Sequence, residues 1–138
     1  MTRIFVNLPV ADLARSIAFY EALGWRTEPR FTDATAACIV VSETIFVMLL
    51  THPKFAGFAP APIGDARERT QVLIALSCPS RGAVDAMVQA AVAAGGPTYG
   101  SPQDHGFMVQ HGFQDPDGHV FEPFWMDEVA VPADRPAG

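Results

Sequence analysis

The chain of 138 residues has few cysteines, and it has no apolar segment long enough to cross a membrane. Its two cysteines, Cys38 and Cys78, lie inside or at the end of apolar segments, so we expect small core residues in a reducing compartment rather than a disulfide or a catalytic thiol. No run of about 18 apolar residues is present, and the N-terminus lacks the pattern of a signal peptide. These absences predict a soluble, cytoplasmic protein with no membrane partner.

Positive charge is also scarce. The chain has 9 Lys and Arg against 15 Asp and Glu, which gives a formal net charge of −6. The basic residues are scattered rather than clustered, so no surface is expected to attract a phosphate backbone, and nucleic acid is excluded as a partner. The hydrophobic content of 49% is enough to fill one core, and the length predicts one domain over residues 1–138.

Two halves of the chain show the same order of expected elements. A short apolar strand comes first, followed by a helix that an Asp or Ser caps (Asp12 and Ser80) and that ends at glycine, and then by further strands. The recurrence predicts two copies of one supersecondary unit. The expected segments are strands 4–9, 25–31, 36–41, 45–51, 71–77, 108–114 and 119–125, helices 12–23 and 80–94, a Pro- and Gly-rich connection 52–65, and a poorly defined segment 97–103.

A tight turn near the end of the chain marks the first candidate site. Asp115-Pro116-Asp117-Gly118 favours a hairpin, and Glu122 then follows inside an apolar strand. A carboxylate in an apolar strand is costly to bury unless it meets a partner, a metal or a wet cavity, so Glu122 is a candidate site residue. The alternative is that Glu122 is a remnant without function that pairs with a neighbouring side chain. If the four residues 115–118 form the loop, His111 lies beside Glu122 on one face; a one-residue slip would place His111 on the opposite face.

The chain resembles the vicinal oxygen chelate superfamily, which includes glyoxalase I, bleomycin-resistance proteins, extradiol dioxygenases and fosfomycin-resistance thiol transferases. The residues that carry this likeness are Ile4 to Leu13 with Ser16, Phe19-Tyr20 and Leu23-Gly24-Trp25, and Asp115 to His119 with Glu122. The chain most resembles small bacterial proteins labelled predicted lactoylglutathione lyase or extradiol dioxygenase, of which Asp104 to Phe107 and Trp125 to Asp127 are also typical.

This resemblance implies an α+β fold in which two βαβββ modules form a curved mixed sheet around a cleft, with the helices on the convex side. Repeat one spans about 1–60, repeat two about 66–127, and a solvated tail covers 128–138. The resemblance also implies a homodimer, and the apolar cleft would otherwise expose a hydrophobic patch.

Metal-binding relatives take their ligands from the first and last strand of each repeat. Carried over by position, these ligands fall on Asn7, on Leu49 with Met48 as the nearest alternative, on Leu73 and on Glu122. Only Glu122 is a strong donor, whereas a divalent ion needs about three or four protein ligands. No cofactor is therefore expected, and a divalent metal, if one binds, would use Glu122.

The resulting hypothesis is a cleft that binds a small organic molecule, with Glu122 and His111 as candidate acid and base groups. His105 would cover the mouth of the cleft, although an ordinary loop histidine is the alternative, and Asn7 would orient the ligand unless its amide is satisfied by backbone. The competing hypothesis is a metal-dependent glyoxalase-type lyase or isomerase, or a dioxygenase, whose reduced site uses Glu122, His111 and His105. The expected lining residues are Phe5, Asn7, Leu49, Leu73, His111, Glu122 and Phe124.

Overall fold

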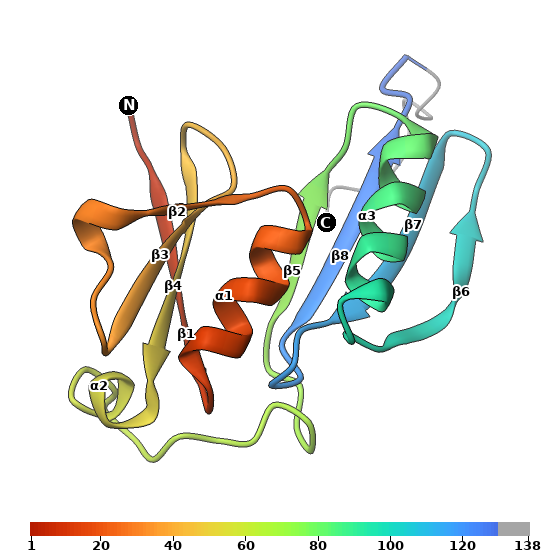
Figure 1. The fold of residues 1–138 in the computed structure, drawn as a ribbon. Coiled ribbons are helices and arrows are strands. Elements are labelled where there is room, and N and C mark those ends of the chain that lie inside the picture. Colours follow the sequence, from red (N-terminus) through yellow and green to blue (C-terminus); the bar gives the residue numbers. More distant parts are fainter. Residues whose placement is uncertain (130–138) are drawn as a thin grey trace.

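The computed structural model describes residues 1–129, which form two modules with the same order of elements (Figure 1). A link that begins with the short helix α2 (His52–Ala56) joins them. The first module contains β1 (Ile4–Val10), α1 (Leu13–Ala22), β2 (Arg26–Glu28), β3 (Ala36–Val40) and β4 (Ile45–Thr51). The second contains β5 (Leu73–Ser77), α3 (Arg81–Ala93), β6 (Thr98–Asp104), β7 (Met108–Gln114) and β8 (Val120–Met126).

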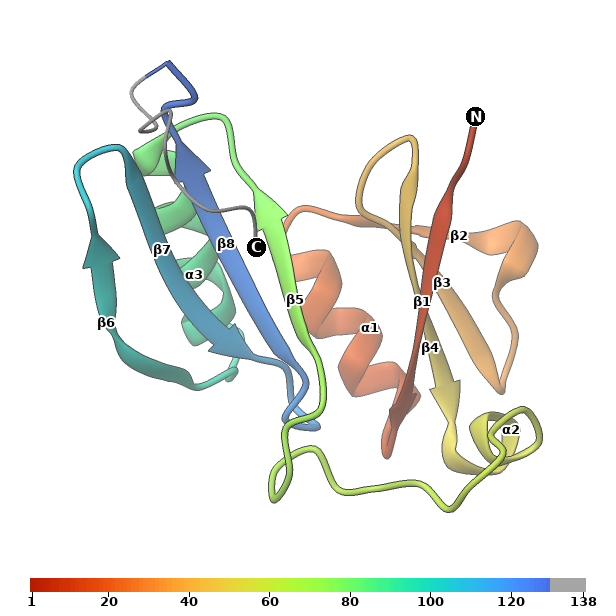
Figure 2. The ribbon, with the colours of Figure 1, turned by 180° about the vertical axis from the view of Figure 1, so that it is seen from behind.

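Each module builds its own four-stranded mixed sheet. The strand orders are β1-β4-β3-β2 and β5-β8-β7-β6, so the two sheets have the same topology. In each sheet the first and last strands of the module pair in parallel, and the remaining pairs are antiparallel. Figures 1 and 2 show α1 and α3 on the same side of the two sheets. The predicted α+β fold with two βαβββ modules is confirmed.

The two long helices begin where the sequence predicts. The side chain of Asp12 accepts a hydrogen bond from the backbone N–H of Arg15, and Ser80 accepts one from Ala83, so each helix has one of its first free N–H groups satisfied. Phe19 and Tyr20 of α1 pack in one hydrophobic core with Phe113 and Phe121 of the second module. The core therefore joins the two modules.

Several short segments differ from the expectation. Residues Pro29–Phe31 form a 3₁₀ turn, since Pro29 fixes φ and cannot donate a ladder hydrogen bond, so β2 ends at Glu28. The segment that lacked a recognisable pattern contains β6, and the expected connection begins with α2. The predicted tail falls, from residue 130 onward, outside the described residues.

The hairpin between β7 and β8 has a loop of three residues, not four. Gln114 pairs with Val120, and the backbone N–H of Asp115 donates to the carbonyl of His119, so only residues 116–118 lie in the loop. Gly118 takes a φ of +92°, as a three-residue hairpin with a glycine bulge requires. The pairing is therefore shifted by one residue from the predicted register.

This turn also fastens the second module to the first. Asp115 is only 1% exposed, and its carboxylate accepts hydrogen bonds from the Tyr20 hydroxyl at 2.6 Å and from the backbone N–H groups of Asp117 and His119. Asp117 in turn accepts from Ala11 N at 2.9 Å. Burial raises the pKa of Asp115, and it raises the pKa of Tyr20 well above its ordinary value. The most recognisable motif of the sequence thus holds the modules together.

Candidate functional site

Residues of β1 alternate between the core and the open face of the first sheet, which is the face away from the helices. Leu8 is buried in the core, whereas Asn7 is exposed and pairs with Met48 of β4. Leu49 is 0% exposed and belongs to the hydrophobic core. The prediction that Leu49 lines a cleft is therefore wrong, and Met48, the alternative, shares the face of Asn7, because neighbouring residues of a strand point to opposite faces.

The second module repeats this arrangement on its own open face. Glu122 pairs with Ala75 of β5, and Leu73, two residues earlier, shares their face and is 56% exposed. Asn7 lies five residues before the helix cap Asp12, and Ala75 lies five residues before the cap Ser80. The second-module equivalent of Asn7 is therefore Ala75 rather than Leu73, and Leu73 corresponds to Phe5. The four equivalent positions are Asn7, Met48, Ala75 and Glu122.

Glu122 holds a small hydrogen-bonded cluster on the open face of the second sheet. Its Oε2 accepts from the Tyr99 hydroxyl at 3.0 Å and from the Gln110 side-chain amide at 3.1 Å. Tyr99 reaches Glu122 across Gly112, where an added Cβ would overlap the phenol end of the tyrosine. Burial and the Glu122 carboxylate raise the pKa of Tyr99 to about 12. Glu122 is thus anchored by neutral donors, and its Oε1 makes no hydrogen bond within residues 1–129.

His111 does not belong to this cluster, so the predicted pair of His111 and Glu122 is wrong. The observed register puts Gly112, not His111, opposite Glu122, and His111 points to the other face. Its Nε2 lies 3.0 Å from the Thr98 hydroxyl, which itself donates to the carbonyl of Gly112. The histidine Nε2–H therefore donates to Thr98. Its buried Nδ1 has no hydrogen-bond partner among the described residues.

The remaining candidate residues occupy separate places. Phe5 lies on the open face of the first sheet, is 46% exposed and stacks on Phe46 with ring centroids 4.5 Å apart. Phe124 shares the face of Glu122 and pairs with Ser77. His105 is exposed in the β6–β7 loop, where its ring lies beside Phe107 and its backbone N–H donates to Met108. Their roles in binding stay predictions.

An apolar cavity of about 710 Å³ borders the open face of the first sheet. Asn7 contributes the single polar side chain among its lining residues, and its amide donates to the carbonyl of Phe5. Its side-chain oxygen accepts no hydrogen bond within residues 1–129 and can therefore accept one from a ligand. Sequence reasoning treated residues 52–65 as a plain connection and missed this cavity. The cavity is lined by Asn7, Pro9, Leu50, Phe55, Phe58, Ala59, Pro60, Ala61, Pro62, Ile63 and Gly64.

Comparison with known proteins identifies the family of this fold. The profile of the glyoxalase/bleomycin resistance protein/dioxygenase superfamily matches residues 4–122. The chain belongs to this superfamily. No curated protein matches the sequence. Members of this superfamily bind small molecules.

Solved structures of other proteins have the same fold. The hypothetical protein SA1046 from S. aureus is 27% identical, with a TM-score of 0.76 over 91% of this chain and 94% of that chain. A glyoxalase/bleomycin resistance protein/dioxygenase family enzyme from Burkholderia phytofirmans PsJN is 20% identical, with a TM-score of 0.73 over 88% of this chain and 96% of that one. A protein of the same family from Nocardioides is also 20% identical, with a TM-score of 0.73 over 100% and 90%.

The residues of this superfamily member do not fit the divalent metal that the family implies. Asn7, Met48, Ala75 and Glu122 provide one carboxylate, one amide, one thioether and one methyl group at the four equivalent positions. Divalent ions bound through nitrogen and oxygen need about three or four such donors. Within residues 1–129, no group of three or more His, Cys, Asp or Glu side chains is placed to hold a metal ion. No chemical step is therefore assigned to a metal.

No helix among the described residues is long and apolar enough to span a membrane.

Proposed function

We propose that this superfamily member binds a small, largely apolar organic molecule without a metal ion. The observation that carries the proposal is the apolar cavity of about 710 Å³, within the size range of small-molecule sites, with the free amide oxygen of Asn7 at its wall. Apolar walls supply affinity through burial, and one polar group orients the ligand. The donor set at Asn7, Met48, Ala75 and Glu122 supports binding that does not depend on a metal.

Acid–base chemistry at Glu122 is the second part of the proposal. One oxygen of the carboxylate is held by Tyr99 and Gln110, and the other is free among the described residues to accept a proton from a molecule on the open face of the second sheet, outside the lining of the apolar cavity. His111 is not the proton partner, because it lies on the opposite face of the sheet. A metal-dependent glyoxalase-type lyase or isomerase, or a dioxygenase, is the less favoured alternative, since its donor set is incomplete.

The apolar cavity is tested with the fluorescent probe N-phenyl-1-naphthylamine, which is uncharged. We expect Phe58→Ala to weaken probe binding about tenfold, because an aromatic wall of the cavity is lost. Phe31→Ala is the matched control: this phenylalanine is 60% exposed and does not line the cavity, so its loss should leave the affinity unchanged. Equal losses in both variants, or no binding by the natural sequence, would refute the cavity as the ligand site.

Binding without a metal ion predicts a low transition-metal content in the purified protein. Protein purified without a polyhistidine tag should contain far less than one transition-metal ion per chain by elemental analysis, because a lone carboxylate does not displace the hydration shell of such an ion. Glu122→Ala and the exposed control Glu68→Ala should then have the same low content. Near-stoichiometric metal that is lost in Glu122→Ala but kept in Glu68→Ala would favour the enzyme alternative.

A homodimer in the cytoplasm completes the proposal. Phe5 and Leu73 are about half exposed on the open faces of the two sheets, and a second copy of the chain would cover such apolar side chains. Cys38 and Cys78 are unpaired, which suits a reducing compartment.

A further inference from the structure

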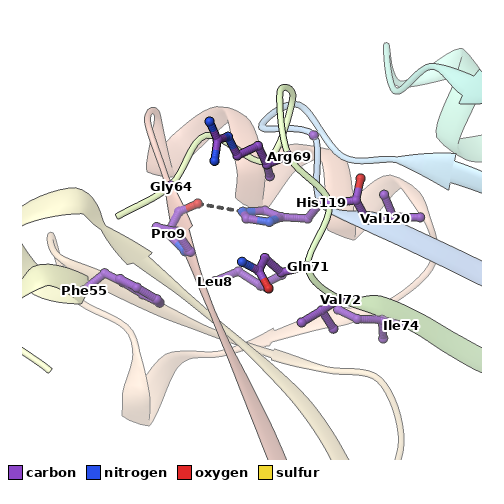
Figure 3. A pocket seen from close by; sticks show the side chains of 13 residues that line it. Leu8, Pro9, Phe55, Gly64, Arg69, Gln71, Val72, Ile74, His119 and Val120 are labelled. Atoms are coloured by element: carbon purple, nitrogen blue, oxygen red, sulfur yellow. Dashed lines mark hydrogen bonds between the residues drawn. The ribbon is translucent and has the colours of Figure 1, made fainter. Parts of the chain in front are cut away.

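A smaller cavity of about 240 Å³ lies where the two modules meet (Figure 3). Leu8 and Pro9 of β1 form one wall, and Arg69, Gln71 and Val72 of the chain that leads into β5 form another. This junction cavity shares three lining residues, Pro9, Phe55 and Gly64, with the larger apolar cavity. The two cavities are therefore neighbours, and one molecule of sufficient length can occupy both.

The junction cavity differs from the apolar cavity in its charge. Arg69 lines it, and no carboxylate is among the lining residues. Within residues 1–129, the Arg69 guanidinium makes neither an ion pair nor a hydrogen bond, whereas Arg30 and Arg81 pair with Glu28 and Asp104. In a chain of net charge −6, this cavity therefore has an unpaired positive charge at its wall.

Two further polar side chains of the junction cavity, His119 and Gln71, are neutral hydrogen-bonding groups, so Arg69 provides its charge. The imidazole Nε2 of His119 donates to the carbonyl of Pro9 at 2.8 Å, so this donor is already used. Gln71 makes no side-chain hydrogen bond to the described part of the chain, and in Figure 3 its amide lies beside Leu8. A guanidinium without a partner suits an anionic group that accepts several hydrogen bonds.

We propose that the molecule bound in the apolar cavity is an amphipathic anion whose carboxylate, sulfonate or phosphate end binds Arg69 at the junction cavity. This inference rests on the proposed function, because the apolar cavity holds the body of the same molecule. A planar guanidinium donates two parallel hydrogen bonds to such an anion, which makes the contact specific as well as strong. Hydrogen bonds to charged groups are worth enough that losing this contact should weaken binding about tenfold or more.

Two fluorescent probes that differ by one charged group test the inference. 8-Anilinonaphthalene-1-sulfonate carries a sulfonate, and N-phenyl-1-naphthylamine has the same rings without it. We expect Arg69→Gln to weaken binding of the sulfonate probe about tenfold and to leave the uncharged probe unaffected. Arg69→Lys should give an intermediate loss, because lysine keeps the charge without the two-pronged geometry. Arg15→Gln, which removes an exposed arginine outside both cavities, should change neither affinity.

The outcomes separate this inference from the proposed function. Failure of both probes to bind the natural sequence would overturn the proposed function and the inference together. Binding of the uncharged probe, with equal affinity of the sulfonate probe for the natural sequence and Arg69→Gln, would overturn the inference alone. An equal weakening of the sulfonate probe by Arg15→Gln would also overturn it, because the effect would then come from net charge. Thermal unfolding of each variant verifies that folding is unchanged.

Discussion

Replacing Asp115 by alanine is expected to lower the free energy of unfolding by about 3–5 kcal/mol. The carboxylate is 1% exposed and accepts three hydrogen bonds, from the Tyr20 hydroxyl and from two backbone N–H groups of its own turn. Alanine would leave these three donors buried without an acceptor, and each such donor costs about 1–3 kcal/mol. Because the turn holds the second module against α1, the loss should lower the stability of both modules. Urea unfolding measures this change.

Two controls isolate the role of Asp115. Asp85→Ala removes an exposed carboxylate from α3 and should change stability by no more than about 0.5 kcal/mol. Asp115→Asn keeps an acceptor oxygen for the backbone N–H groups and should cost less than Asp115→Ala. A loss in Asp115→Ala no larger than that in Asp85→Ala would show that the turn does not fasten the modules.

The pH dependence of Asp115→Asn gives a further check. Burial raises the pKa of Asp115 above its ordinary value, so the folded state favours the protonated carboxyl. The stabilisation from this shift is complete below the unfolded pKa, near 3.9, and is lost as the pH rises through the raised folded pKa. The stability of the natural sequence relative to Asp115→Asn should therefore decrease as the pH rises above about 4.

The fold was predictable because its signals are local. Asp12 and Ser80 mark the starts of the two long helices within the sequence itself, and the apolar spacing that follows each cap identifies the buried face. The recurrence of the same order of elements then indicated two modules. β6 gave no such signal, because Gly100 and Pro102 interrupt the alternation that a strand normally shows.

The candidate site was less predictable because shifts of one or two residues along a strand change which side chains share a face or a position. A loop of three residues rather than four shifts the β7–β8 pairing, so His111 turns away from Glu122 and Gly112 takes its place. The same small shift separates Leu49, in the core, from Met48, on the open face. Counting back from the helix caps avoids this error, since it selects Asn7 and Ala75 as equivalent positions without any assumption about turns.

The apolar cavity was not predictable by these means. It forms where the irregular segment 58–64 lies against Asn7 and Pro9 of β1, far away in the sequence. Such a segment has no periodicity, so the sequence does not show which side chains it turns towards the sheet. Tyr99 is a similar case: its contact with Glu122 depends on the absence of a side chain at Gly112, which only the sheet register reveals.

Gly112→Ala is expected to separate Tyr99 from Glu122 and to return the pKa of Tyr99 from about 12 towards its ordinary value of 10.0. The new Cβ would overlap the phenol end of Tyr99, which is 37% exposed and free to swing into solvent. Both causes of the raised pKa, burial and the neighbouring carboxylate, are then lost together. The acid dissociation constant of Tyr99 should rise by about two orders of magnitude.

Absorbance of tyrosinate measures this change, because the chain has only two tyrosines and the pKa of Tyr20 lies well above its ordinary value. At pH 11 Gly112→Ala should show about one ionised tyrosine per chain and the natural sequence much less, with circular dichroism verifying that both are folded. Introducing Tyr99→Phe into Gly112→Ala should remove this absorbance, which would assign the absorbance to Tyr99. An unchanged titration in Gly112→Ala would show that the glycine does not hold Tyr99 against the carboxylate.

The same shift contributes to the loss of stability at alkaline pH. A raised pKa means that the folded state favours neutral Tyr99, so its stabilising contribution is complete below pH 10 and is lost between pH 10 and about 12. Gly112→Ala lacks that contribution at every pH, and its stability should therefore fall less steeply across this interval than that of the natural sequence. A smaller slope of stability against pH in Gly112→Ala would show that the missing side chain at Gly112 allows the neutral Tyr99 phenol to lie against the Glu122 carboxylate. The phenol then donates a hydrogen bond to Glu122 without bringing a positive charge.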